Sequence, residues 1–200
     1  MTRPVFRLDR HHAVLLLALL LVAPACGEKN GGPGEGGGGG SAGSGGGAQL
    51  VPADLKGPEG VAFVKMDLPF GTIEVPDGKD WSVVQGAPIQ VQGADGTVVM
   101  LQAQDGITPD QRDDYLASYH DVQMRDAPKY ERVVQETGQA GGAPAARVEG
   151  KFDNGTAFVT RDYLMFRKGK VAVIAGRIPA THAARLAPLV DHMTATFEMK

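Results

Sequence analysis

The chain has 200 residues, of which 42% are hydrophobic and 22% charged, as is typical of a soluble globular domain with some additional segments. Its formal net charge is −3. Residues 1–25 hold three arginines and one aspartate, a net +2, so subtracting them from −3 leaves −5 for the rest of the chain. We therefore expect no nucleic-acid binding, because contact with phosphates needs a basic surface.

Residues 1–25 have the pattern of a targeting segment that is removed from the mature protein. Three arginines precede an uncharged apolar run from Ala13 to Ala25. That run is shorter than the stretch of about 20 apolar residues that a membrane-spanning helix needs. The only cysteine of the chain, Cys26, follows directly, so no disulfide can form within the chain.

The stretch VAPAC, residues 22–26, resembles the lipobox of bacterial lipoprotein signal peptides. The resemblance implies that a diacylglyceryl group is attached to the Cys26 thiol, that residues 1–25 are then removed, and that the new amino terminus receives a fatty acid such as palmitate. Ala23 stands where the lipobox prefers leucine, and Pro24 is an unusual residue at its position. The alternative is an ordinary secretory signal with a cysteine near its cleavage site by chance.

A lipidated Cys26 would fix the location of the protein. Two or more acyl chains hold a protein stably on a bilayer, whereas one binds only marginally. The expected location is the bacterial cell envelope, facing the periplasm. The residue after the cysteine is Gly27 and not aspartate, which favours the outer membrane over the inner one where the sorting rule of enteric bacteria applies.

Residues 26–48 are expected to form a tether between the anchor and a folded domain that spans residues 49–200. The segment is dominated by glycine and has almost no apolar side chains, so it cannot bury enough surface to offset the entropy of ordering it. A random coil of this length spans about 25 Å on average and about 75 Å when fully stretched. A dinucleotide-binding glycine loop is not expected, because neither a strand before it nor a helix after it is present.

Alternating apolar and polar residues predict strands early in the domain. In GTIEVPDG, residues 71–78, Ile73 and Val75 are expected to share one face of a strand. The segment PIQVQGADGTVVMLQAQ, residues 88–104, predicts a hairpin with Asp95 and Gly96 as positive-φ turn residues and with Gln90 on the polar face.

A helix is expected next, with Thr108 as N-cap and Gln111 in the position of a capping box. It should end before Pro128. Its apolar stripe consists of Tyr115, Leu116, Tyr119 and Val122.

Residues 146–178 predict a three-stranded meander, with a type I′ turn at Asn154-Gly155 and a second turn at Lys168-Gly169. After Pro179, apolar residues at three- and four-residue spacing predict a last helix that includes Pro188. Its apolar stripe consists of Leu186, Leu189, Val190, Met193 and Phe197. Strands joined by hairpins, with two helices, indicate an α+β fold with a mainly antiparallel sheet flanked by helices.

Four stretches resemble the PsbP-like superfamily, over roughly residues 60–200. They are IEVPDGKDW, VVMLQAQDGITPDQRDDYLASY, GAPAARVEG and LAPLVDHMTATFEMK. Here Lys79 and Asp80 separate Gly78 from Trp81, a departure from the family's Pro-Gly-Trp-like turn. The resemblance implies an α/β/α sandwich. The superfamily includes an extrinsic subunit of photosystem II, a Ran-binding nuclear-import factor and bacterial lipoproteins of the DcrB type, and its members mostly bind partners or assist assembly.

The residues of the domain show no catalytic or metal-binding pattern. His120, His182 and His192 lack the spacing of a zinc site, and dipole complementation at a helix start explains the acidic residues after Thr108 better than a calcium loop does. No serine lies in a nucleophile elbow. We expect His120 to be a half-exposed helix residue and His192 to lie on a solvated helix face. No cofactor is predicted.

Trp81, Arg161 and Arg167 are the candidates for a partner or ligand surface. Core packing is an alternative role for Trp81, as is solubility for the charged residues of the meander, Arg161, Asp162, Arg167, Lys168 and Lys170. The sequence thus favours a lipid-anchored, non-catalytic protein that binds a protein or an envelope component. The alternatives are a small envelope hydrolase with His192 or His182 as base, and an assembly or chaperone factor.

Overall fold

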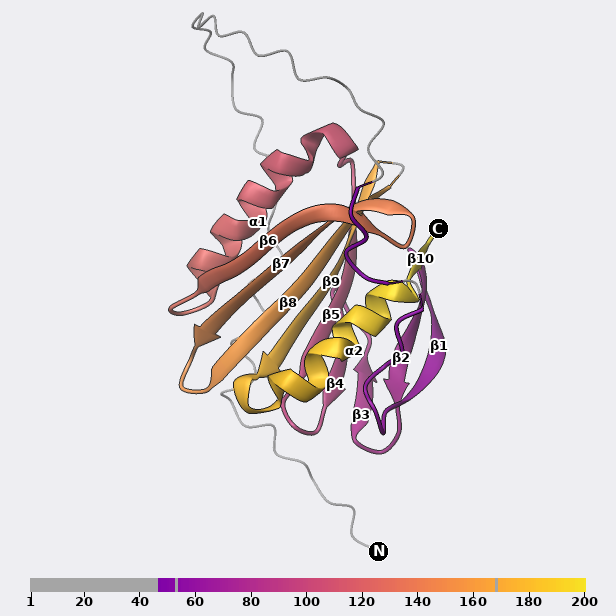
Figure 1. The fold of residues 1–200 in the computed structure, drawn as a ribbon, viewed down its shortest axis with the longest axis vertical. Helices are drawn as coiled ribbons and strands as arrows, with labels where there is room; N and C mark the ends of the chain where they lie inside the picture. Colours follow the sequence, from indigo (N-terminus) through magenta and orange to yellow (C-terminus); the bar gives the residue numbers. More distant parts are fainter. Residues whose placement is uncertain (1–46, 53, 168) are drawn as a thin grey trace, which may run out of the picture. The chain divides into compact units, whose positions relative to one another are not determined.

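The computed structural model describes residues 47–52, 54–167 and 169–200 (Figure 1). The predicted signal peptide, Cys26 and the tether up to residue 46 lie outside the described residues, as does Lys168. Residues 47–200 form one compact unit.

The unit is built on a seven-stranded antiparallel sheet (Figure 1), which confirms the predicted fold class. Its spatial order is β3-β4-β5-β9-β8-β7-β6. The strands are β3 (Trp81–Val84), β4 (Ile89–Gly93), β5 (Val98–Asp105), β6 (Glu131–Ala140), β7 (Ala143–Asp153), β8 (Ala157–Arg167) and β9 (Lys170–Pro179).

A second, smaller sheet has the order β1-β2-β10. It consists of β1 (Ala62–Leu68), β2 (Gly71–Asp77) and the short β10 (Glu198–Met199). The sequence predicted the β2 alternation correctly, because Ile73 and Val75 are buried while Thr72 and Glu74 are partly exposed. The prediction was wrong for the chain end, where Glu198 and Met199 pair with β2 and do not continue the last helix.

Helix α1 (Arg112–Asp126) and helix α2 (Ala183–Ala195) cover opposite faces of the large sheet. Neighbouring residues of a strand point to opposite faces. On β8, Asp162 accepts a hydrogen bond from Tyr119 of α1, while Tyr163 donates one to Asp191 of α2. This arrangement is the predicted α/β/α sandwich.

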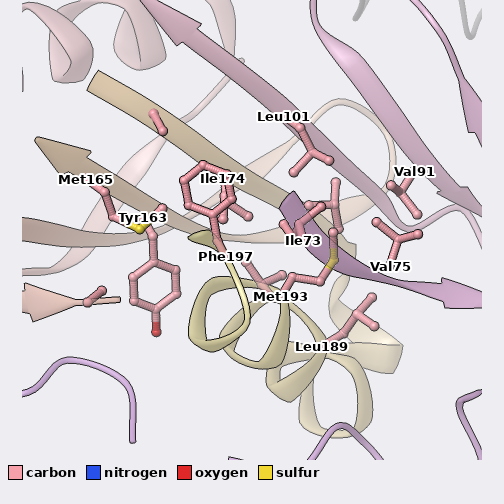
Figure 2. Packing of buried hydrophobic residues seen from close by; sticks show 14 of the residues in the cluster. Ile73, Val75, Val91, Leu101, Tyr163, Met165, Ile174, Leu189, Met193 and Phe197 are labelled. Carbon is pink, nitrogen blue, oxygen red and sulfur yellow. The ribbon is translucent and has the colours of Figure 1, made fainter. Parts of the chain in front are cut away.

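The main apolar core lies between α2, the large sheet and β2. Figure 2 shows side chains from these elements converging, with Leu189 and Met193 of α2 near Ile73 and Val75 of β2. The predicted stripe of α2 is confirmed, since Leu186, Leu189, Val190 and Met193 are fully buried. Phe197 is also buried but follows the helix.

Helix α1 begins three residues later than the sequence predicted. One 3₁₀ turn, Pro109–Gln111, precedes Arg112. The Gln111 side chain reaches back and accepts hydrogen bonds from the amide and the hydroxyl of Thr108, both at 3.0 Å. Thr108 therefore starts the turn and not the helix, while the end at Asp126, before Pro128, agrees with the prediction.

Two of the three predicted turns, at Asn154-Gly155 and then at Asp95-Gly96, depend on a single glycine and not on two positive-φ residues. Gly155 and Gly96 have φ of 102° and 89°, whereas Asn154 and Asp95 do not have positive φ. Asp153 pairs with Ala157, so the first loop has three residues and is not a type I′ turn. In the second, the Asp95 carboxylate accepts a hydrogen bond from the Thr97 amide at 3.0 Å.

Candidate functional site

The structure does not bring Trp81, Arg161 and Arg167 together. Strand pairing puts all three on the α2 face of the sheet, but β4, β5 and β9 lie between the strand of Trp81 and the strand of the two arginines. Trp81 is half-buried and packs against Gly93 and the core. Arg161 and Arg167 are six residues apart on β8, or about 20 Å.

Arg161 belongs to a half-buried group of charged side chains beside α2, which we call the α2-face ionic cluster. Its Nη1 lies 2.7 Å from Asp191 Oδ2 of α2, and its Nη2 lies 3.0 Å from Glu149 Oε1 of β7. Arg147 of β7 reaches the same Glu149 oxygen at 3.3 Å and Glu136 of β6 at 3.2 Å. Carboxylates and guanidinium groups thus alternate across four elements.

The ionic cluster is partly open to solvent. The Arg161 and Arg147 side chains are 20% and 24% exposed, and that of Glu136 is 50% exposed. Tyr163 orients the Asp191 carboxylate of the cluster, because its hydroxyl donates a hydrogen bond to Asp191 Oδ1 at 2.7 Å. Burial and the neighbouring Asp191 carboxylate raise the pKa of Tyr163 above its usual range, which keeps the phenol a hydrogen-bond donor.

Asp162 does not belong to this surface, so the prediction of an exposed charge there was wrong. Asp162 is fully buried under α1 and forms an ion pair with Arg177 of β9. Tyr119 donates to its other oxygen at 2.7 Å, and Arg177 also donates to Gln123 Oε1 at 3.1 Å. The alternation of side chains along β8 explains this position, because the even-numbered residues of β8 face α1.

The buried pair is closed to solvent, and its pKa shifts agree with that. Burial raises the pKa of Asp162 while Arg177 lowers it, and the net shift is upward. Burial and then the Asp162 charge raise the pKa of Tyr119 well above its usual value. For Arg177, burial is the largest single influence and lowers the pKa, but Asp162 and Tyr119 together outweigh it and raise the pKa above its usual range. This cluster holds α1 on the sheet.

His192 does not lie on a solvated helix face, contrary to the prediction. Its side chain is only 12% exposed, and its ring centroid lies 4.1 Å from that of Phe63. Nδ1 is 3.0 Å from the Leu55 carbonyl oxygen, and Nε2 is 2.8 Å from Glu74 Oε2. Both ring nitrogens therefore face acceptor oxygens of the protein, and neither faces a hydroxyl group.

The other two histidines show no catalytic arrangement either. His120 is half-buried on α1, as expected, with its ring 6.0 Å from that of Tyr130. His182 ends the 3₁₀ turn Ala180–His182, which precedes α2. In the part of the chain that the structure describes, no histidine ring is hydrogen-bonded to a serine or threonine hydroxyl, and no three His, Cys, Asp or Glu side chains are grouped as a metal site needs.

Sequence reasoning found Arg161 but missed Arg147, Glu149 and Asp191. Arg147 and Glu149 alternate with buried residues along β7, which was a signal for a shared face. Asp191 could be assigned to the cluster only once the position of α2 was known. None of the helices within the described ranges is long and apolar enough to span a bilayer.

Comparison with protein-family models and with curated protein sequences finds no match. Solved structures do match. The Ran-binding protein Mog1p of Saccharomyces cerevisiae has 14% identity and a TM-score of 0.53, covering 69% of this chain and 95% of its own. CyanoP, the cyanobacterial PsbP of Synechocystis, has 12% identity and a TM-score of 0.51, and the match covers 73% of this chain and 99% of CyanoP.

LpqN of Mycobacterium tuberculosis, involved in cell envelope biogenesis, has 13% identity and a TM-score of 0.49, and the match covers 71% of this chain and 92% of LpqN. At such low identities the similarity to Mog1p and CyanoP concerns architecture alone. The described domain therefore has the PsbP-like α+β fold that Mog1p and CyanoP share.

Proposed function

We propose that this protein is a lipid-anchored, non-catalytic component of the bacterial cell envelope, whose PsbP-like domain binds a protein partner or an envelope component. The anchor is a diacylglyceryl group on Cys26, and the domain faces the periplasm, with the outer membrane as the favoured location. Residues 26–46 act as the tether, and the compact unit of residues 47–200 forms the binding domain.

The sequence around Cys26 supports the anchor. A basic start, an apolar run of the length of a signal peptide, a lipobox-like VAPAC and a glycine-rich stretch follow each other in the order that a lipoprotein requires. With lipid at Cys26, a tether that spans about 25 Å on average keeps the domain close to the bilayer. The partner or envelope component must then lie within that reach.

The α2-face ionic cluster is the observation that carries the binding role. Arginine is enriched among the residues that carry most of the binding energy at protein interfaces. An arginine that carboxylates already hold in place loses less side-chain entropy when a partner binds. Arg147 and Arg161 are both held in this way. A binding role also agrees with the shared fold of Mog1p, a Ran-binding protein.

The engagement of His192 argues against the hydrolase hypothesis. A general base must reach the proton of a nucleophile or a water through a free nitrogen. Both His192 nitrogens instead face the Leu55 carbonyl and the Glu74 carboxylate. We therefore favour binding over catalysis.

Replacing the anchor cysteine tests the location. A Cys26→Ser variant, expressed in a bacterial host with labelled palmitate, is expected to lose the label and to leave the membrane fraction. A Ser44→Ala variant in the same glycine-rich stretch is the control and keeps both. If the Cys26→Ser protein stays with the membranes, the anchor hypothesis is wrong.

Site-specific photo-crosslinking tests the binding surface. A photoreactive residue at Glu136, in the ionic cluster, is compared with one at Met124, on α1 and the opposite face of the sheet; both positions are about half exposed. We expect one stoichiometric crosslinked species from position 136 and none from 124. Equal yields at both positions, or no product at 136, would contradict a partner on this surface.

A further inference from the structure

The described part of the chain begins with a segment that crosses α2 and β6, which we call the strap: residues 47–52 and 54–57. Its start is fixed to the end of β6. Gln49 forms a parallel bridge with Gln139, the Leu50 amide donates to the Gln139 carbonyl at 2.9 Å, and the Gln139 amide donates to the Ala48 carbonyl at 3.0 Å. Val51 is buried in the core, with 2% of its surface exposed.

The far end of the strap passes over Phe63 and His192. A Cβ on Gly57 would overlap the Phe63 ring, so the strap approaches that ring as closely as a glycine allows. The Phe63 ring in turn lies against His192. Two residues earlier, the Leu55 carbonyl oxygen lies 3.0 Å from His192 Nδ1, a polar contact between this end of the strap and α2.

His192 is placed between two groups that can only accept hydrogen bonds. A backbone carbonyl faces Nδ1, and a Glu74 carboxylate oxygen faces Nε2 at 2.8 Å. A neutral imidazole has one N–H and one lone pair, whereas the imidazolium has two N–H groups. Both contacts can therefore be hydrogen bonds only when the ring is charged. Loss of the proton leaves one lone pair facing an acceptor oxygen.

Other charged groups around the ring do not replace either contact. From β1, Lys65 lies opposite Glu74 in the strand pairing and extends to Glu198 at 4.0 Å. On α2, Asp191 is turned to Arg161. The strap itself carries Asp54 and Lys56, both exposed. Glu74 is thus the charged partner of His192, and Leu55 is its link to the strap.

We propose that His192 is a proton-controlled latch on the strap, closed when the imidazole is charged and weakened when it is neutral. Histidine is the side chain whose charge ordinarily changes between pH 5 and 8. When the ring is charged, His192 donates to Leu55 and Glu74 together; when the ring is neutral, one of the two hydrogen bonds is lost. Opening the latch releases the far end of the strap and leaves the bridge to Gln139 and the buried Val51 to hold its start. The latch does not depend on lipid at Cys26.

Hydrogen exchange of the Leu50 amide, followed by NMR on the full-length chain in detergent micelles, tests the latch. The protection factor, corrected for the intrinsic exchange rate at each pH, is expected to fall about tenfold from pH 5 to pH 8, the effect of losing one hydrogen bond. Amides of the central strand β9 report global unfolding, and their protection factors should not show this fall between pH 5 and pH 8. The ring nitrogen signals of His192 should show two N–H groups at pH 5.

Two variants separate the latch from a general effect of pH. In Glu74→Gln, the side-chain amide at position 74 can donate to the unprotonated Nε2 of a neutral His192, while Nδ1–H still donates to the Leu55 carbonyl. Leu50 protection should then stay high up to pH 8. In His192→Gln, protection should be lower than in the wild type at pH 5 and should not change with pH. A wild-type protection factor that is flat with pH, or an unchanged pH dependence in Glu74→Gln, overturns the proposal.

Discussion

Asp162 and Arg177 form an ion pair that is closed to solvent between α1 and the large sheet. The pair sits on neighbouring central strands, and Tyr119 and Gln123 attach it to the helix. A buried charge that loses its partner is strongly destabilising, whereas an apolar pair of similar volume can replace both charges at little cost. The pair therefore allows a direct test of how α1 is held.

The Arg177→Met variant is expected to lower the free energy of unfolding by about 3–5 kcal/mol, because it leaves the Asp162 carboxylate buried and unpaired. Urea denaturation followed by circular dichroism measures the loss. The double variant Asp162→Leu/Arg177→Met is the control and should be more stable than Arg177→Met alone. A double variant that is less stable than the single one would show that the charges stabilise the fold.

The Arg177→Met variant should also change how stability depends on pH. Burial already raises the pKa of Asp162, and Arg177 lowers it, so removing Arg177 raises the pKa further. A carboxyl group whose folded-state pKa is raised binds its proton more tightly in the folded state, so stability falls as pH rises from the unfolded pKa, about 3.9, through the folded one. The variant should thus be closest to the wild type near pH 4 and furthest near pH 7 in urea titrations. A constant difference between pH 4 and 7 contradicts this explanation.

Gly176 of β9 sets how closely α2 approaches the sheet. A Cβ at this position would lie 2.5 Å from Val190 Cγ2 and 3.2 Å from the Arg161 carbonyl oxygen. Gly176→Ala is expected to destabilise the protein by about 1–3 kcal/mol through overpacking. Adding Val190→Ala should recover part of that loss, since the two sites are in contact and their effects are not additive. Thermal unfolding measures both, and strictly additive losses would contradict the predicted clash.

Much of the fold could be predicted because its central elements carry local signals. Strands β7, β8 and β9 follow from apolar runs separated by glycine turns, and α2 follows from its buried stripe. Strand β6 was not predicted, because it lies at the sheet edge and most of its side chains are exposed, which removes the alternating pattern. Gln90 was expected to be exposed and is buried.

The candidate site was harder to predict because its contacts are distant in sequence. His192 contacts Leu55 and Glu74, which precede it by more than 100 residues. Asp162 meets Tyr119, 43 residues earlier. One local signal was available: Arg177 is a charge near the end of an otherwise apolar strand, β9, which indicates a buried partner. No local pattern identifies which carboxylate that partner is.

Arg147 provides the test of the ionic cluster as a binding surface. Its guanidinium joins Glu136 and Glu149 and is 24% exposed. Arg147→Ala is expected to lower the yield of the partner crosslinked from position 136 about tenfold, the effect of removing one interface arginine worth about 1.4 kcal/mol. Stability should change by only about 1 kcal/mol, because solvent screens the pair. Lys151→Ala, on the same face of the same strand but paired with Glu131, is the control and should leave the yield unchanged. If Arg147→Ala leaves the yield unchanged, or Lys151→Ala lowers it equally, the partner does not contact the cluster through Arg147.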